Sequence, residues 1–140
     1  MRLHYQVDGE DFLRAGEASA SLKRTLKQLG MDATIIRKIA IAMYEAEMNM
    51  VIHADGGDID VEICTDYVTV ILKDIGPGIP DIDLAMKAGY STASHQIREL
   101  GFGAGMGLPN MKKYSDALHI ESKVGSGTTV TIKVFVATNE

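Results

Sequence analysis

Residues 58–74 read DIDVEICTDYVTVILKD, and this stretch decides the fold class. In its first half, Ile59, Val61 and Ile63 alternate with acidic residues, a pattern that is typical of a strand with one face in water. Residues 67–73 form a second apolar run after a short turn, so we expect the two runs to pair as a hairpin. A hairpin at this point favours an antiparallel sheet.

The rest of the chain predicts further strands and helices around this hairpin. Strands are expected at residues 2–8 and 117–122 and after Gly127, and helices at residues 10–29, 32–53, 81–88 and 108–114. Asp32 is expected to cap the second helix, in which apolar residues recur every three or four positions. The fold class predicted is α/β: a two-layer sandwich, with a mostly antiparallel sheet and helices on one face.

Composition restricts the class of protein. The chain has 140 residues, 46% of them hydrophobic, which suits one domain spanning residues 1–140. Its 14 basic and 19 acidic residues give a net charge of -5 without a basic run, so we expect no nucleic-acid partner. Cys64 is the only cysteine, and there is no signal-like or membrane-spanning apolar run. We therefore expect a cytoplasmic protein without a membrane partner.

The first candidate site stretch is YEAEMNMVIHA, residues 44–54. Glu45, Asn49 and His53 are spaced four residues apart, so they share one face of the second helix, while Glu47 lies roughly opposite. A carboxylate beside an amide oxygen suits Mg2+. Taken alone, such a stripe is more often a solvated helix face.

The second stretch is LKDIGPGIPD, residues 72–81. Asp74 ends a strand there, and Gly76, Pro77 and Gly78 turn the chain. Asp74 beside a bare backbone could accept a hydrogen bond from an exocyclic amine such as that of adenine. A plain turn is the commoner explanation of this stretch by itself.

The third stretch is LGFGAGMGLP, residues 100–109, in which glycine occupies every second position from 101 to 107. So many glycines would weaken a strand, whereas a loop of this kind can bring its backbone N–H groups close to a phosphate. It does not match a P-loop, which needs Gly-Lys-Ser/Thr, or a dinucleotide-binding fingerprint, which follows a first strand. Nor does the chain carry the kinase H-R-D loop.

The order of these stretches is more specific than any one of them. E-x-x-x-N-x-x-x-H at 45–53, D-x-G-x-G at 74–78, G-x-G-x-G at 103–107 and G-x-G-T-T at 125–129 resemble the four nucleotide-binding boxes of the GHKL ATPase superfamily. That superfamily includes gyrase, histidine kinases and MutL. DIGPGIPDIDLAMKAGYSTA and GAGMGLPNMKKYSD are most similar to RsbT-type switch serine kinases and related anti-sigma factors. The resemblance covers residues 35–134 and implies the histidine kinase-like ATPase fold.

The resemblance also implies roles for individual residues. Glu45 would be the catalytic general base, Asn49 would bind Mg2+, and Asp74 would bind the adenine amino group of ATP. The glycines from 103 to 107 would form a lid over the phosphates, and Thr128 or Thr129 would complete the adenine pocket. The cofactor-binding set implied is Asn49, His53, Asp74, Gly76, Gly78, Ile79, Gly103, Gly105, Gly107, Leu108, Thr128 and Thr129.

Two functions follow from the resemblance. The leading hypothesis is an ATP-dependent serine/threonine kinase that uses Mg2+ and phosphorylates a STAS-type anti-sigma antagonist in a partner-switching module. The alternative is a non-catalytic, ATP-dependent binding module, either an anti-sigma factor or a nucleotide-sensing regulator of a partner enzyme. Expected partners are a STAS-domain antagonist and a sigma factor or other regulated protein, and a homodimer is left open. Residues 94–100, SHQIREL, lengthen the lid relative to the compact RsbT pattern.

Overall fold

The computed structural model describes residues 1–8, 14–52, 56–76, 107–123 and 125–136. The helix expected at residues 81–88 and nearly all of the glycine-rich segment lie outside these ranges. The strands are β1 (Arg2–Asp8), β2 (Gly56–Ile63), β3 (Tyr67–Asp74), β4 (Ala117–Lys123) and β5 (Gly127–Phe135). The helices are α1 (Glu17–Gln28), α2 (Ala33–Ile52) and α5 (Gly107–Tyr114).

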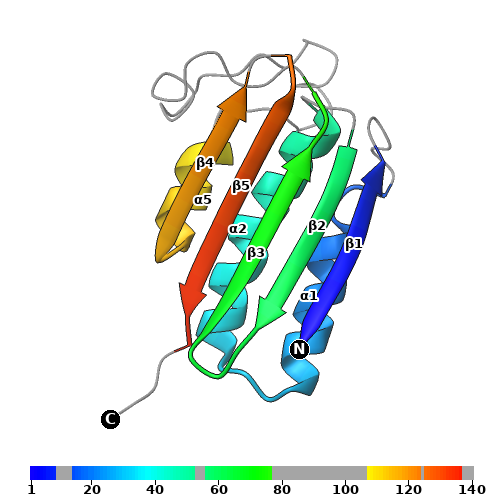
Figure 1. Ribbon diagram of the computed structural model, residues 1–140. Helices are drawn as coiled ribbons and strands as arrows, with labels where there is room; N and C mark the ends of the chain where they lie inside the picture. Colours follow the sequence, from blue (N-terminus) through cyan, green and yellow to red (C-terminus); the bar gives the residue numbers. More distant parts are fainter. Residues whose placement is uncertain (9–13, 53–55, 77–106, 124, 137–140) are drawn as a thin grey trace.

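The described strands form a five-stranded sheet in the order β1-β2-β3-β5-β4, and every neighbouring pair is antiparallel (Figure 1). The hairpin predicted from residues 58–74 is confirmed, because β2 pairs with β3 in a register that places Ile59 opposite Leu72 and Ile63 opposite Val68. Strand β5 pairs on the other side of β3. The sheet is therefore built outward from the central hairpin.

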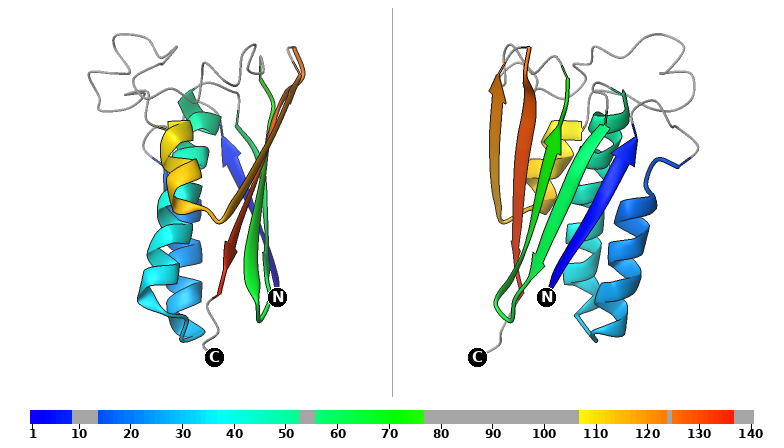
Figure 2. Two further views of the ribbon diagram at one scale, coloured as in Figure 1. Left: turned by 90° about the vertical axis from the view of Figure 1, so that its left-hand side faces the viewer. Right: turned by 45° about the vertical axis from the view of Figure 1, so that its right-hand side comes forward.

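The three described helices cover one face of the sheet, which confirms the two-layer sandwich (Figure 2). Helix α2 is the central helix, and the structure bears out its apolar periodicity. Of its predicted apolar positions, Ile39 and Ala42 are 1% and 0% exposed. From the sheet side, alternate residues such as Ile59 and Ile132 enter the same core, each 0% exposed. None of the described helices combines the length and apolar character needed to cross a membrane.

The N-terminal ends of α2 and α1 differ in how they are stabilised. Asp32 caps α2 as predicted, because its Oδ2 accepts a hydrogen bond of 3.0 Å from the backbone N–H of Thr34. The prediction for α1 was wrong at its start: residues 14–16 form a turn, and the helix begins at Glu17. Gly16 has a φ of 93°, a left-handed conformation that ends any helix entering from residues before it. The remainder of the predicted start, residues 10–13, lies outside the described ranges.

Four chain ends from distant parts of the sequence lie at one end of the sandwich (Figures 1 and 2). They are the C-terminal ends of α2 and β3 and the N-terminal ends of β5 and α5. All three candidate stretches contribute to this end: α2 carries Glu45, β3 ends at Asp74, and α5 begins at Gly107. The fold therefore gathers candidate residues that are far apart in the sequence.

Candidate functional site

Asp74 lies where β3 meets the start of β5. The backbone N–H of Thr128 donates a hydrogen bond of 2.8 Å to Asp74 Oδ1. Gly127 makes this approach possible, since a Cβ added there would lie 2.4 Å from the backbone oxygen of Asp74, and its φ is 120°. The second glycine of the G-x-G-T-T stretch, Gly127, is thus required for β5 to reach Asp74.

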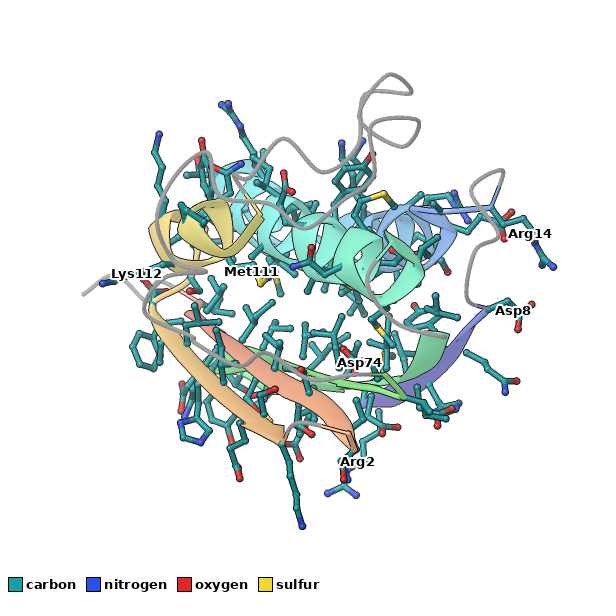
Figure 3. All side chains as sticks on the ribbon, turned by 90° about the horizontal axis from the view of Figure 1, so that it is seen from above. Arg2, Asp8, Arg14, Asp74, Met111 and Lys112 are labelled. Carbon is teal, nitrogen blue, oxygen red and sulfur yellow. The ribbon has the colours of Figure 1, made fainter. Side chains whose placement is uncertain are left out.

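Asp74 belongs to the residues of β3 that face the helix layer, because it continues the alternation of the buried Val70 and Leu72. Figure 3 shows it between the helices and the sheet. Burial raises the pKa of Asp74 above the ordinary aspartate value, and the N–H of Thr128 partly opposes this shift. A half-buried carboxylate with one oxygen held by the backbone can present its other oxygen to a ligand donor.

The structure separates the two threonines that the sequence left as alternatives. Thr128 is 7% exposed, and its Oγ1 lies 2.9 Å from the hydroxyl oxygen of Ser122. It shares the inward face of β5 with Val130, whereas Thr129 belongs to the alternate set of β5 residues. Only Thr128 therefore lies on the same side of the sheet as Asp74.

Glu45 lies on α2 and faces α5. Its Oε2 accepts a hydrogen bond of 3.3 Å from the side-chain amide of Asn110. Burial raises the pKa of Glu45 above the ordinary glutamate value, and the hydrogen bond from Asn110 opposes that shift. A desolvated carboxylate with a raised pKa is a stronger proton acceptor than an exposed one, which suits a general base.

Asn110 is held in place because α5 is anchored in the hydrophobic core. Met111, the next residue, is 0% exposed and is labelled beneath the helix in Figure 3. The hydroxyl of Ser115 donates a hydrogen bond of 2.6 Å to the backbone oxygen of Met111, which closes the end of the helix. Sequence reasoning missed Asn110. The signal available was a polar residue of low helix propensity, directly after Pro109, inside a predicted helix.

The remaining predicted residues divide into four groups. Asn49 follows Glu45 by one helical turn and is partly exposed, as the predicted stripe requires. Gly76 lies two residues after Asp74, and Ile75 between them is 65% exposed. Gly107 and Leu108 lie in the first turn of α5. The residues outside the described ranges are His53, Gly78, Ile79, Gly103 and Gly105.

Glu47 has a different environment from Glu45, as its opposite place on the helical wheel predicts. It is 2% exposed and accepts hydrogen bonds at the start of α1. Its Oε2 accepts from the N–H groups of Gly16 and Ala18 at 3.0 and 3.1 Å, and its Oε1 accepts from the N–H and the hydroxyl of Ser19 at 3.0 and 2.7 Å. The carboxylate therefore caps α1 from another helix, a role that local sequence does not reveal.

A separate cavity of about 390 Å³ lies between β1 and α1. Tyr5, Arg14 and Arg24 are among the residues that line it, and Glu47 contributes from α2. None of the described residues in the predicted nucleotide-binding set borders this cavity. It is therefore distinct from the site formed around Asp74 and Glu45.

The antiparallel sheet, the helices on one face and the carboxylates gathered at one end define an ATPase domain of the histidine kinase-like class. A sequence model of the family described as histidine kinase-, DNA gyrase B-, and HSP90-like ATPase matches residues 34–138, and the chain belongs to this family. This confirms the GHKL resemblance and the predicted fold class.

Sequence relatives narrow the similarity further. The serine/threonine-protein kinase RsbT of Bacillus subtilis (strain 168) is 32% identical over 112 residues, which cover 77% of this chain and 78% of RsbT. An anti-sigma F factor of Clostridium beijerinckii is 37% identical over 111 residues, 74% of each chain. The similarity predicted to RsbT-type kinases and anti-sigma factors is thus confirmed.

Solved structures agree on the fold. The crystal structure of the RsbU and RsbW domains of a Mycobacterium tuberculosis protein matches with a TM-score of 0.64 and 19% identity, over 96% of this chain and 32% of that one. A mycobacterial sensor histidine kinase, MprB, matches with a TM-score of 0.54 and 19% identity, over 95% and 97% of the two chains. At these identities the structures support the fold.

Proposed function

We propose that this chain is an ATP-dependent serine/threonine kinase of a partner-switching module, and that it phosphorylates a STAS-type antagonist protein. The observation that carries the proposal is the environment of Glu45, a half-buried carboxylate on the C-terminal half of α2 that is held by Asn110. The C-terminal ends of α2 and of β3, which ends at Asp74, lie at the same end of the sandwich (Figure 1). The similarity to RsbT, a protein named as a serine/threonine kinase, supports the same reaction.

In this proposal Asp74 holds the nucleotide. Its carboxylate accepts a hydrogen bond from the adenine amino group, while the N–H of Thr128 fixes the other side of the carboxylate. Thr128 closes the adenine pocket from β5, since it lies on the same side of the sheet as Asp74. Gly76, one residue beyond Ile75, leaves the backbone open to the flat face of the base.

The start of α5 is suited to the phosphates. Gly107 begins the helix, so the first N–H groups of α5 are not used within the helix and can donate to an anion. The positive end of the helix dipole favours negative charge at the same place. Gly103 and Gly105 complete the proposed lid by sequence resemblance.

Mg2+ fits the donor set on α2. Asn49 offers an amide oxygen one turn from the carboxylate of Glu45, and Mg2+ commonly takes only one or two protein ligands beside phosphate oxygens and waters. Asn49 would hold the ion, which neutralises charge on the transferred phosphoryl group. The described residues contain no group of three or more His, Cys, Asp or Glu side chains arranged to bind a metal by themselves.

In the proposed phosphotransfer step, Glu45 lies beside the hydroxyl group that accepts the phosphoryl group. The hydroxyl oxygen of a serine or threonine in the partner attacks the γ-phosphorus, a new O–P bond forms, and the bond to the β,γ-bridging oxygen breaks to release ADP. The hydroxyl proton passes to the Glu45 carboxylate. The raised pKa of Glu45 favours this transfer, because the carboxylate holds the proton more tightly than an exposed glutamate does.

Sequestration of a sigma factor is a second candidate, supported by the 37% identity to a protein named as an anti-sigma F factor. One experiment separates the two. Proteins captured from the native cell by the purified chain are incubated with it, Mg2+ and γ-labelled ATP. Label on a serine or threonine of a captured protein supports the kinase, and label that disappears with Glu45→Ala assigns the base. A stable, ATP-dependent complex without any label would contradict the kinase and favour sequestration.

A further inference from the structure

We infer that Asn110 is a positioning residue, which holds the Glu45 carboxylate in the orientation that accepts the substrate proton. The inference rests on the proposed role of Glu45 as the general base. Its geometric basis is the 3.3 Å hydrogen bond from Asn110 Nδ2 to Glu45 Oε2, which joins two helices across 65 positions of sequence.

The hydrogen bond distinguishes the two oxygens of Glu45. Asn110 donates to Oε2, so Oε1 is the oxygen that remains to accept a proton from the attacking hydroxyl. A glutamate side chain has three rotatable bonds, and an unrestrained carboxylate would sample several orientations. A donor fixed on the neighbouring helix selects one of them, which is the condition for efficient proton transfer.

Three features of α5 make Asn110 a rigid donor. Pro109 fixes the backbone directly before it, in the first turn of the helix, where proline is tolerated. Met111 directly after it is 0% exposed and anchors the helix in the core. Asn110 itself is partly buried, so its side chain has less freedom than a surface asparagine. The donor thus lies between a residue of fixed backbone and a residue anchored in the core.

Local helix stability does not account for asparagine at this position. Asparagine has a lower helix propensity than alanine, leucine, lysine or glutamine, because its short amide competes for backbone hydrogen bonds. Its neighbours Lys112 and Lys113 are exposed helix formers, as a helix surface ordinarily prefers. A residue that breaks a local preference while contacting a half-buried carboxylate is better explained by that contact.

The same contact links the base to the phosphate end of the site. Asn110 lies three residues after Gly107, the first residue of α5. In the proposed function the first N–H groups of this helix face the phosphates. A change in the position of α5 would therefore move the Glu45 carboxylate. In this arrangement one short helix contacts both the nucleotide and the base.

A double-mutant cycle tests the inference with ATP hydrolysis, measured as phosphate release in a single turnover with excess protein and Mg2+. Water replaces the protein substrate here and requires the same base. We expect Asn110→Ala to lower the rate by up to about 10²-fold with ATP affinity unchanged. In a Glu45→Ala background it should have no further effect. Lys112→Ala, on the exposed side of α5, is the matched control and should hydrolyse ATP at the wild-type rate.

A conservative variant and a spectroscopic measurement complete the test. Asn110→Gln, which keeps an amide donor, should recover part of the rate lost in Asn110→Ala. In the nucleotide-free protein, the side-chain NH2 signals of Asn110 should shift in Glu45→Ala and stay unchanged in Lys112→Ala. Unchanged NH2 signals in Glu45→Ala would show that the contact does not form in solution.

The outcomes separate this inference from the proposed function. If Glu45→Ala slows hydrolysis and Asn110→Ala does not, the base stands and the positioning role is overturned. Equal losses from Asn110→Ala in the presence and absence of Glu45 would also overturn it, because the effect would not act through Glu45. If the wild type shows no hydrolysis and no label transfer, the general base fails, and the positioning role fails with it. The NH2 signals would then report only a contact between helices.

Discussion

The backbone N–H of Thr128 donates a hydrogen bond of 2.8 Å to Asp74 Oδ1, and this contact joins the first residues of β5 to the last residue of β3. Burial raises the pKa of Asp74, which means that the charged carboxylate is less stable in the folded protein than in water, despite that N–H. An aspartate at a position where the fold destabilises its charged form is better explained by ligand binding than by a contribution to folding.

Asp74→Asn should therefore weaken nucleotide binding without unfolding the protein. Loss of a charge-assisted acceptor is expected to cost about 1.5 to 3 kcal/mol, or roughly 10- to 150-fold in affinity for ATP. The asparagine oxygen can still accept the hydrogen bond from Thr128, so β5 should keep its place. Titration calorimetry with ATP and ADP measures the change, and Asp66→Asn, an exposed residue in the β2–β3 turn, is the control. Unchanged affinity in Asp74→Asn would remove the assigned adenine contact.

Glu45→Gln should lose phosphotransfer while keeping or raising stability at neutral pH. The folded-state pKa of Glu45 lies above the ordinary value because of burial, so the folded protein binds this proton more tightly than the unfolded chain. The free energy of unfolding should thus fall as the pH rises from the ordinary glutamate range through the raised pKa. Above that window the wild type carries a penalty that glutamine avoids.

Urea unfolding of the wild type and Glu45→Gln at several pH values measures this effect. The two proteins should differ most at neutral pH and converge below the ordinary glutamate range, where Glu45 is protonated in both states. A variant that is less stable than the wild type at neutral pH would indicate that the hydrogen bond from Asn110 outweighs the desolvation of Glu45.

The elements that could be predicted from sequence are those set by local periodicity. Alternation in residues 58–74 gave the hairpin, and the recurrence of apolar residues gave α2 and its cap at Asp32. The start of α1 could not be predicted, because a carboxylate about 30 positions away satisfies its first N–H groups. Asn110 was missed for the same reason, since its partner lies on another helix. Long-range contacts of single polar side chains have no periodic signal.

Glu47→Ala should destabilise the protein strongly. The substitution removes the acceptor for Gly16, Ala18 and Ser19 at the start of α1, and buried donors that lose a charged partner are costly. We expect a loss of about 3 kcal/mol or more, since single hydrogen bonds to charged groups contribute roughly 1.5 to 3 kcal/mol. Ser19→Ala, which removes only the 2.7 Å hydroxyl contact, should cost less, roughly 1.5 kcal/mol, the lower end of the range for one hydrogen bond to a charged group. Equal unfolding midpoints for the wild type and Glu47→Ala would show that Glu47 does not cap α1.

Gly127→Ala should impair both stability and nucleotide binding, because it acts on the approach of β5 to Asp74. The added Cβ would lie 2.4 Å from the Asp74 backbone oxygen and 3.1 Å from its Oδ1, so either strand must shift. Gly125→Ala is the matched control: Gly125 also has a positive φ, of 86°, but a Cβ there meets nothing within 4 Å. Both variants carry backbone strain of roughly 1 to 2 kcal/mol.

Gly127→Ala should add to this strain about 1 to 3 kcal/mol from overpacking, and it should weaken ATP binding, since Asp74 moves with the strand. Chemical unfolding and calorimetry of the two variants separate the effect of backbone strain from the effect of a shift of β5 relative to Asp74. Gly125→Ala should lose stability and keep its affinity for ATP. If Gly127→Ala also bound ATP with wild-type affinity, the contact between β5 and Asp74 would not be part of the nucleotide site.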